Sequence, residues 1–176
     1  YSGTTIEECT NEGEIFSRIS QVNRMGGIVG TINTGGSLLK CKNLGKVGVE
    51  NSGNDNWQAV GGIFGFEEKA TSEENKVLVS ECSNSGEVYV SLVNNTSHSN
   101  KIGLGGIAGL VCSNFVLVEN NANTGKVHGT NSGSASLYVG GIVGWYLKGK
   151  GFKTKGNVNS GEVSADASDC AAGGII

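Results

Sequence analysis

The feature that most restricts how this chain can fold is a glycine-flanked isoleucine that recurs five times. GGIVG at 26–30 returns unchanged at 140–144, with GGIFG at 61–65 and GGIAG at 105–109 between them, and GGII occupies 173–176. Such a recurrence indicates a chain assembled from copies of one unit.

A second motif alternates with the first. It reads Cys or Asn, any residue, Asn, any residue, Gly, then Glu or Lys and Ile or Val, at 9–15, 41–47, 82–88, 121–127 and 157–163. Successive copies start 32, 41, 39 and 36 residues apart. A period of this size is typical of solenoids and propellers.

The composition of each unit favours β-strands. The units are rich in Gly, Asn, Ser and Val, and the stretch after each Asn-x-Gly alternates with period two, so Val47 and Val49 are expected to point inward and Lys46 outward. We expect about three short strands per repeat: one before the Cys or Asn, one after the Asn-x-Gly, and the GGI segment itself. Asn and Gly tolerate positive φ, so the Asn-x-Gly is expected to form the turn between the first two strands.

One column of charges distinguishes a solenoid from a propeller. The residue after the motif glycine alternates strictly in sign through Glu14, Lys46, Glu87, Lys126 and Glu162. Equivalent residues of stacked parallel coils lie about 4.8 Å apart, where like charges repel and opposite charges attract. We therefore predict an all-β, right-handed parallel β-helix (β-solenoid) of about five coils, the hand following the usual crossover preference.

Two further columns are interpreted as structural ladders. Asparagine side chains stacked along the axis can hydrogen-bond from coil to coil, which gives the ladder Asn11, Asn43, Asn84, Asn123 and Asn159. Glycines beside a constant isoleucine indicate that something packs closely over the GGI segment, either the repeat's own long loop or another chain. The isoleucine column is Ile28, Ile63, Ile107, Ile142 and Ile175.

Composition excludes several classes of protein. The chain has 30 Gly and no Pro among 176 residues, and its 13 basic and 16 acidic residues give a net charge of −3. This balance gives no electrostatic basis for binding nucleic acid, and no apolar run is long enough to span a bilayer. The chain begins and stops close to repeat boundaries, so residues 1–176 are expected to be a single solenoid domain from a longer array.

The cysteines and histidines do not predict a metal site or cofactor. Cys9, Cys41 and Cys82 occupy a repeat position that is Asn in the other copies. A residue exchangeable with Asn is expected to be a small packed side chain rather than an essential disulfide partner. There is no Cys-x-x-Cys and only two histidines are present, so we predict neither metal ligands nor a cofactor.

The candidate ligand-binding residues lie in loops. Trp57 follows a polar run rich in Asn that includes Asp55, and Trp145 and Tyr146 come directly after a GGIVG segment. An aromatic face beside Asn or Asp could bind a sugar, but packing of each ring beneath its own loop is the favoured interpretation. A glycosidase needs clustered carboxylates, and the candidates are Asp166 with Asp169 and the group Glu67, Glu68, Glu73 and Glu74. Solvated loop charge is the favoured interpretation of both groups.

The repeats resemble the GLUG motif of bacterial surface proteins, in which a Gly-Gly-hydrophobic-x-Gly strand alternates with an x-Asn-x-Gly-x-Val segment. The resemblance covers essentially the whole chain, with Ile in place of the usual Leu. Such repeats occur in adhesin-like proteins of gut bacteria and in non-catalytic regions of IgA-cleaving metallopeptidases. The resemblance implies a secreted or cell-surface β-helical region and carries over no catalytic residue.

We therefore expect a non-catalytic, extracellular module that presents loops to a host glycan or matrix protein. One alternative is a passive stalk in a larger secreted protein such as a peptidase. A second is a polysaccharide lyase or hydrolase built on a β-helix. Neighbouring repeats or domains of the parent chain are the other expected partners, and neither nucleic acid nor membrane insertion is expected.

Overall fold

The period-two segments of every repeat form strands that pair in parallel with the equivalent strands of neighbouring repeats, so the chain is a β-solenoid. A computed structural model describes residues 3–18, 23–51, 57–68, 70–93, 100–147 and 152–176. In these residues each of the first four coils contributes five strands, and the fifth coil contributes four. The predicted fold class is confirmed, but a coil holds more strands than the expected three.

Three of the sheets form the outer wall of the stack. Sheet 1 contains β1 (Thr5–Glu7), β6 (Ser37–Leu39), β11 (Val77–Ser80), β16 (Val116–Glu119) and β21 (Lys153–Lys155). Sheet 2 contains the two-residue strands β2 (Thr10–Asn11), β7 (Lys42–Asn43), β12 (Ser83–Asn84), β17 (Ala122–Asn123) and β22 (Val158–Asn159). Sheet 3 contains β3 (Ile15–Ser17), β8 (Val47–Asn51), β13 (Val88–Leu92), β18 (Val127–Asn131) and β23 (Val163–Ala167).

The other two sheets fold inside this wall. Sheet 4 contains β4 (Asn23–Gly26), β9 (Gln58–Gly61), β14 (Lys101–Gly105), β19 (Ser136–Gly140) and β24 (Cys170–Gly173). Sheet 5 contains β5 (Val29–Asn33), β10 (Phe64–Glu68), β15 (Ala108–Val111) and β20 (Val143–Tyr146). The described helix is a single 3-10 turn, η1 (Glu73–Asn75), between β10 and β11.

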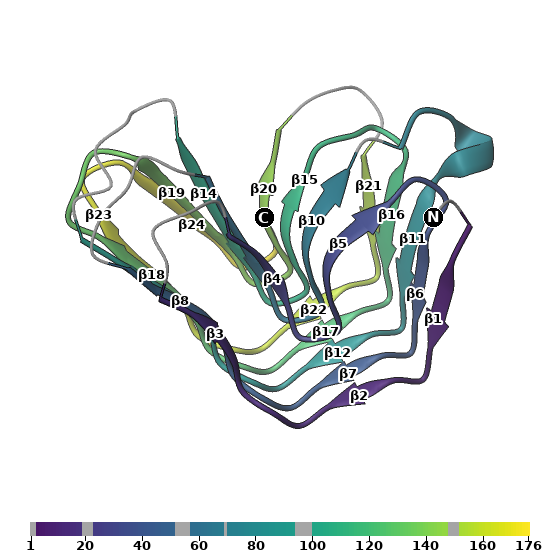
Figure 1. The fold of residues 1–176 in the computed structure, drawn as a ribbon, viewed down its shortest axis with the longest axis horizontal. Coiled ribbons are helices and arrows are strands. Elements are labelled where there is room, and N and C mark those ends of the chain that lie inside the picture. Colours follow the sequence, from purple (N-terminus) through teal and green to yellow (C-terminus); the bar gives the residue numbers. More distant parts are fainter. Residues whose placement is uncertain (1–2, 19–22, 52–56, 69, 94–99, 148–151) are drawn as a thin grey trace.

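In cross-section, sheets 1 to 3 form an open outer wall, and sheets 4 and 5 form a V inside it (Figure 1). Each coil descends along sheet 1, crosses the floor in sheet 2 and rises along sheet 3. It then turns back down sheet 4 to the floor and rises again along sheet 5. This path divides the interior into two lobes and leaves sheets 4 and 5 facing each other across the middle.

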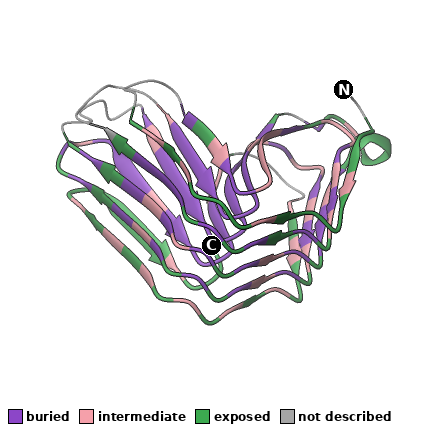
Figure 2. Cartoon of the chain, turned by 60° about the horizontal axis from the view of Figure 1, so that its bottom comes forward, coloured by how far each residue is buried: buried purple, intermediate pink, exposed green. Residues whose placement is uncertain are grey.

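Each lobe holds its own apolar core. The first lobe, between sheets 1 and 5, buries Phe64, Val79 and Val118, and the second, between sheets 3 and 4, buries Val47, Val88 and Leu104. Burial is deepest in the central coils, whereas the strands of the fifth coil are half-buried or exposed (Figure 2). The core therefore depends on each coil being covered by its neighbours.

The GGI segment is a corner between two strands, so its assignment as one strand is wrong. Gly26 ends β4, Gly27 and Ile28 form a bend, and Val29 begins β5. A Cβ added to Gly27 would overlap Asn43 Cγ on the floor and the Gly62 carbonyl of the next corner. The close packing expected over the glycines therefore comes from the asparagine column and the adjacent corner.

The isoleucine of each corner reaches into the first lobe. Ile63, Ile107 and Ile142 are fully buried, whereas Ile28 at one end is half-buried and Ile175 at the other is exposed. The isoleucine column is confirmed as a packing ladder in the coils that have neighbours on both sides.

The asparagine column forms a continuous hydrogen-bonded ladder, as predicted. Asn43 Nδ2 donates to Asn84 Oδ1 at 2.7 Å, and Asn84 Nδ2 donates to Asn123 Oδ1 at 2.7 Å. Asn11 donates likewise to Asn43 and Asn123 to Asn159, each at 2.8 Å. Each Nδ2 also donates to the carbonyl of its own motif glycine, as Asn84 does to Gly86 at 2.8 Å. Both amide protons are therefore bonded in these four residues.

The motif glycine has a different role from the one expected. Positive φ falls one residue before the Cys or Asn column, at Glu8, Lys40, Glu81, Asn120 and Gly156. The motif glycine does not adopt positive φ. It is required because a Cβ at Gly86 would overlap the carbonyl oxygen of Gly45 in the coil before it.

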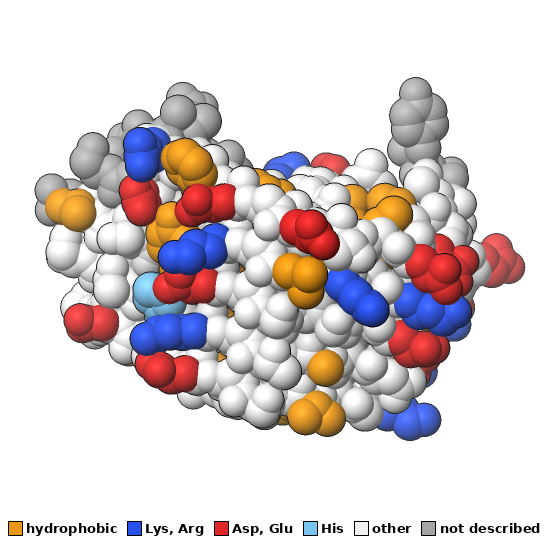
Figure 3. Space-filling model, turned by 90° about the horizontal axis from the view of Figure 1, so that it is seen from below, with side chains coloured by type: hydrophobic (Ala, Val, Ile, Leu, Met, Phe, Trp, Pro, Cys, Tyr) orange, Lys and Arg blue, Asp and Glu red, His pale blue; other side chains and the backbone are white. Residues whose placement is uncertain are grey.

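The charge column alternates along the outer wall as predicted (Figure 3). Lys46 Nζ lies 2.6 Å from Glu87 Oε2, and Lys126 Nζ lies 3.0 Å from Glu162 Oε1. The second oxygen of Glu87 lies 2.8 Å from His128 Nε2. The hydrogen bond from Lys46 is the main cause, and that from His128 the second, of a Glu87 pKa below its usual value.

At the first position of the repeat motif, Cys and Asn side chains donate to equivalent backbone carbonyls. Cys82 Sγ donates to the Leu38 carbonyl at 3.5 Å, and Asn121 Nδ2 donates to the equivalent Val79 carbonyl at 3.0 Å. All five cysteines are free thiols. Their interpretation as small packed side chains is confirmed for Cys41 and Cys82, which are buried.

Candidate functional site

Sheets 4 and 5 approach each other closely beside the corners because glycines face each other there. A Cβ at Gly65 would lie 2.6 Å from the Met25 carbonyl oxygen, and one at Gly103 would lie 2.6 Å from the Gly109 carbonyl oxygen. Larger side chains follow these glycines toward the open end of the V. The two sheets therefore diverge into a cleft that runs along the stack.

The cleft has a volume of about 330 Å³ and is mostly apolar. Sheet 4 and the residue before β9 supply Asn23, Arg24, Trp57 and Ala59. The opposite wall, on sheet 5 and the residues after its strands, consists of Phe66, Leu110, Cys112 and Leu147. An apolar hollow with a few polar groups at its margin has the character of a ligand site.

An aromatic cluster forms the C-terminal side of the cleft. The centroids of the Trp57 and Trp145 rings lie 5.4 Å apart, and Trp145 stacks on Tyr138 at 5.3 Å with an interplanar angle of 11°. Gly103 lies between these coils, and a Cβ there would lie 3.3 Å from Trp145 Cβ. The missing side chain at Gly103 thus makes room for the indole of Trp145.

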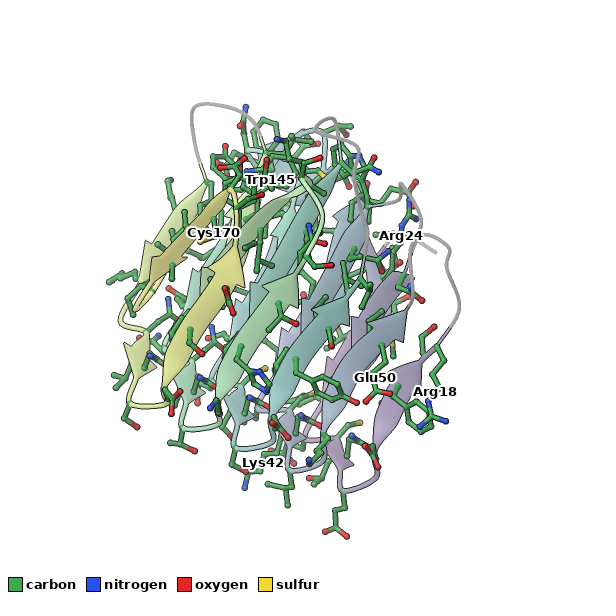
Figure 4. All side chains as sticks on the ribbon, turned by 90° about the vertical axis from the view of Figure 1, so that its left-hand side faces the viewer. Arg18, Arg24, Lys42, Glu50, Trp145 and Cys170 are labelled. Carbon is green, nitrogen blue, oxygen red and sulfur yellow. The ribbon has the colours of Figure 1, made fainter. Side chains whose placement is uncertain are left out.

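The Arg24 side chain lies over the Phe66 ring at the N-terminal side of the cleft. The guanidinium carbon of Arg24 lies 4.2 Å from the centroid of the Phe66 ring. Arg24 is exposed and Phe66 is half-buried. Figure 4 shows Arg24 and Trp145 at the same rim of the molecule but in coils far apart along the stack.

A buried carboxylate supports the sheet 5 wall. Glu67 is fully buried and accepts hydrogen bonds from the backbone amides of Ala70, Cys112 and Ser113 at 2.6, 2.9 and 3.0 Å. The Ser113 hydroxyl donates to it at 2.8 Å. Glu67 therefore holds the Cys112–Ser113 backbone in place at the wall of the cleft, and the interpretation of this residue as solvated loop charge is wrong.

Of the four predicted ligand residues, two lie at the cleft and one lies elsewhere. Trp57 lines the cleft, and Trp145 packs against it from the C-terminal side. Tyr146 lies on the other face of β20, where its ring stacks on Phe152 at 4.8 Å and its hydroxyl donates to Asn114 Oδ1 at 2.8 Å. Tyr146 is therefore part of the first lobe, and Asp55 lies outside the described residues.

Sequence reasoning missed Arg24, Phe66, Tyr138 and Glu67. Strict alternation from Phe64, which faces the first lobe, would turn Phe66 into the same lobe. The structure differs because β10 departs from strict alternation. Phe64 is buried in the first lobe, and so is Ile32, the residue paired with Glu67. Phe64 and Glu67 therefore face the lobe although they are three positions apart, and the two residues between them, Gly65 and Phe66, face the cleft.

A second hollow is a charged surface groove. It lies at the bend between sheets 1 and 2 and is lined by Glu8, Thr10, Lys40, Lys42 and Glu81. Lys40 Nζ lies 3.5 Å from a Glu7 oxygen and 3.6 Å from a Glu8 oxygen. The interaction with Glu7 is the main cause of a raised Lys40 pKa. Lys40 is therefore already paired with carboxylates, which makes the groove a weaker candidate.

The two aspartates that could serve a hydrolase lie away from the cleft lining. Asp169 Oδ2 accepts a hydrogen bond from Ser136 Oγ at 2.5 Å, and Asp166 is exposed on β23. Within the described part of the chain, no three His, Cys, Asp or Glu side chains are placed to hold a metal ion.

The same described ranges contain no helix that is long and apolar enough to cross a bilayer. Comparison with known proteins adds no relative, since no family model, no curated protein and no solved structure matches this chain.

Proposed function

We propose that this solenoid is a non-catalytic binding module and that the cleft between sheets 4 and 5 binds a glycan. The observation that carries the proposal is the half-exposed indole of Trp57 in an apolar hollow of about 330 Å³, backed by Trp145 and Tyr138. The proposal includes an extracellular or cell-surface location in a GLUG-type adhesin-like protein, which the repeat pattern supports.

The aromatic cluster suits a sugar because of its shape and chemistry. A sugar ring has one apolar face, which can cover an indole, while its hydroxyls reach polar groups at the rim. The cleft offers the exposed Arg24 at that rim, whereas the buried Asn23 amide donates to Gln58 Oε1 at 2.7 Å. The stack of Trp145 on Tyr138 holds Trp57 from one side, so less conformational entropy is lost on binding.

The test is a glycan and extracellular-matrix array probed with the wild type, Trp57→Ala and Phe16→Ala. Phe16 is an exposed aromatic residue on sheet 3 and serves as the matched control. We expect selective glycan binding that falls at least tenfold in Trp57→Ala and persists in Phe16→Ala. Equal loss in both variants, or binding to matrix proteins alone, would contradict a glycan site at the cleft.

A stalk is the second candidate, and the axial ladders favour it. Hydrogen-bonded asparagines and paired charges join every described coil to the next, which produces a stiff rod. An array without any selective binding would support the stalk and overturn the glycan site.

A further inference from the structure

We propose that the glycan recognised by the cleft is acidic, with a sugar carboxylate bound by Arg24. This inference rests on the proposed function and adds the chemical class of the ligand. It follows from the placement of Arg24, from the charge of the surrounding residues and from the orientation of the cleft.

Arg24 differs from several other basic residues of the described surface, which face carboxylates. Arg18 pairs with Glu50 at 3.4 Å, Lys46 with Glu87 at 2.6 Å and Lys126 with Glu162 at 3.0 Å. Among the described residues, no carboxylate lies within ion-pair distance of Arg24. The guanidinium is instead held by the Phe66 ring at 4.2 Å.

Stacking prepares the guanidinium for an anion. At 4.2 Å from the ring centroid the guanidinium is close enough to stack on Phe66, an arrangement that leaves its in-plane N–H donors free for an anion. A carboxylate can accept two parallel hydrogen bonds from such a fork. The stack also restricts the side chain before binding, which lowers the entropy lost when the ligand arrives.

The charge of the lining agrees with an acidic ligand. None of the eight residues that line the cleft is a carboxylate, and Arg24 is the charged residue among them. Glu67 follows Phe66 in sequence, but it is fully buried and bonded to the Cys112–Ser113 backbone. Glu68 is exposed at the end of β10 and forms no ion pair with Arg24.

The cleft also sets the direction of the ligand. Arg24 belongs to the first coil and Trp57 to the second, and Trp145 lies in the fourth. Three coil spacings correspond to about 14 Å along the stack. An acidic oligosaccharide would lie parallel to the solenoid axis, with its carboxylate at Arg24 and a sugar face against Trp57.

The test compares each acidic glycan with its own methyl ester, which removes only the charge. Isothermal titration calorimetry would use oligogalacturonate, hyaluronan oligosaccharides and sialyllactose, each as acid and ester. The proteins are the wild type, Arg24→Gln, Arg24→Lys and the control Arg18→Gln.

We expect the wild type to bind at least one acid about tenfold or more tightly than its ester, because charge-assisted bidentate bonds are strong. Arg24→Gln should abolish the preference, Arg24→Lys should keep part of it, and Arg18→Gln should leave it unchanged. Equal affinity for acid and ester, or a preference that survives Arg24→Gln, would overturn the acidic ligand while leaving glycan binding in place. Failure to bind any acid, ester or neutral glycan of the array would overturn both proposals.

Discussion

The indole rings of Trp57 and Trp145 lie 5.4 Å apart, centroid to centroid, although they come from the second and fourth coils. Gly103 of the third coil has no side chain beside this contact, and a Cβ added to it would lie 3.3 Å from Trp145 Cβ. The missing side chain at Gly103 therefore leaves room for Trp145, whose contact with Trp57 spans three repeats and forms one side of the cleft.

This contact predicts a shared optical signal. Trp57 and Trp145 are the only tryptophans of the chain, and their transitions should couple at this distance. We expect Trp57→Phe and Trp145→Phe to remove the same near-UV circular dichroism feature. If the losses in the two variants (wild type minus variant) differ in shape and add up to the whole tryptophan signal, the rings do not interact. Phe16→Leu is the control for a distant aromatic change.

The asparagine ladder predicts a large cost for one amide at its centre. Asn84→Ala would leave the Asn43 Nδ2 donor, the Asn123 Oδ1 acceptor and the Gly86 carbonyl without the partner they now have. A loss of about 3 kcal/mol in the free energy of unfolding is expected, since each unpaired buried group is costly.

Asn159→Ala is the matched control for that variant, because Asn159 is half-buried in the last coil and accepts from Asn123 only. Urea unfolding would measure both variants. Equal losses of unfolding free energy in the two variants would mean that burial of the amide does not determine its contribution to stability.

The corner glycines predict a contrast within one column. A Cβ at Gly106 would overlap both the Gly141 carbonyl oxygen and Asn123 Cγ, whereas one at Gly174 would have no atom within 4 Å. Gly106→Ala should destabilise the fold by about 3 kcal/mol or prevent folding, because backbone and buried amide cannot move aside. Gly174→Ala should change thermal unfolding little. A stable Gly106→Ala protein with an unchanged melting temperature would refute the close packing of corner and ladder.

The Glu87 carboxylate predicts a defined pH dependence. Lys46, and next His128, lower the pKa of Glu87 in the folded chain. The stabilisation is therefore present above the unfolded pKa of about 4.3 and is lost as the pH falls through the lower folded value. Glu87→Gln should reduce stability near pH 7 by less than about 1 kcal/mol, since the partners are partly exposed, and should have little effect near pH 2.

Urea unfolding across this pH range measures the effect, with the exposed Glu12→Gln as control. A Glu87→Gln difference of the same size at both ends of the range would exclude the ionised carboxylate as its source.

Burial predicts a hierarchy of thiol reactivity. Burial is the largest cause that raises the pKa of Cys82 to about 12, and it also raises the pKa of Cys41. Iodoacetamide reacts with thiolates, so at pH 8 the native protein should be labelled at the exposed Cys9 and Cys170 and not at Cys82. Peptide mass mapping with and without urea reads each site. Native labelling of Cys82 at the rate of Cys9 would contradict the buried column.

The features that the sequence determined are those that repeat with the coil. The sign alternation from Glu14 to Glu162 predicted parallel stacking, and the asparagine and isoleucine columns predicted ladders that the structure contains. A parallel stack places equivalent residues side by side, so a column in the sequence becomes a row of contacts in space.

Contacts between columns of different sheets were decided only by the tertiary structure. Nothing in a single repeat shows that Gly26 to Val29 turns a corner, since the fit of Gly27 depends on Asn43 on the floor. The cleft is of the same kind, because Arg24 and Phe66 meet across two sheets and the irregular alternation of β10 turns Phe66 toward Arg24. Periodicity fixes which residues share a column, whereas the bends of each coil decide which columns face each other.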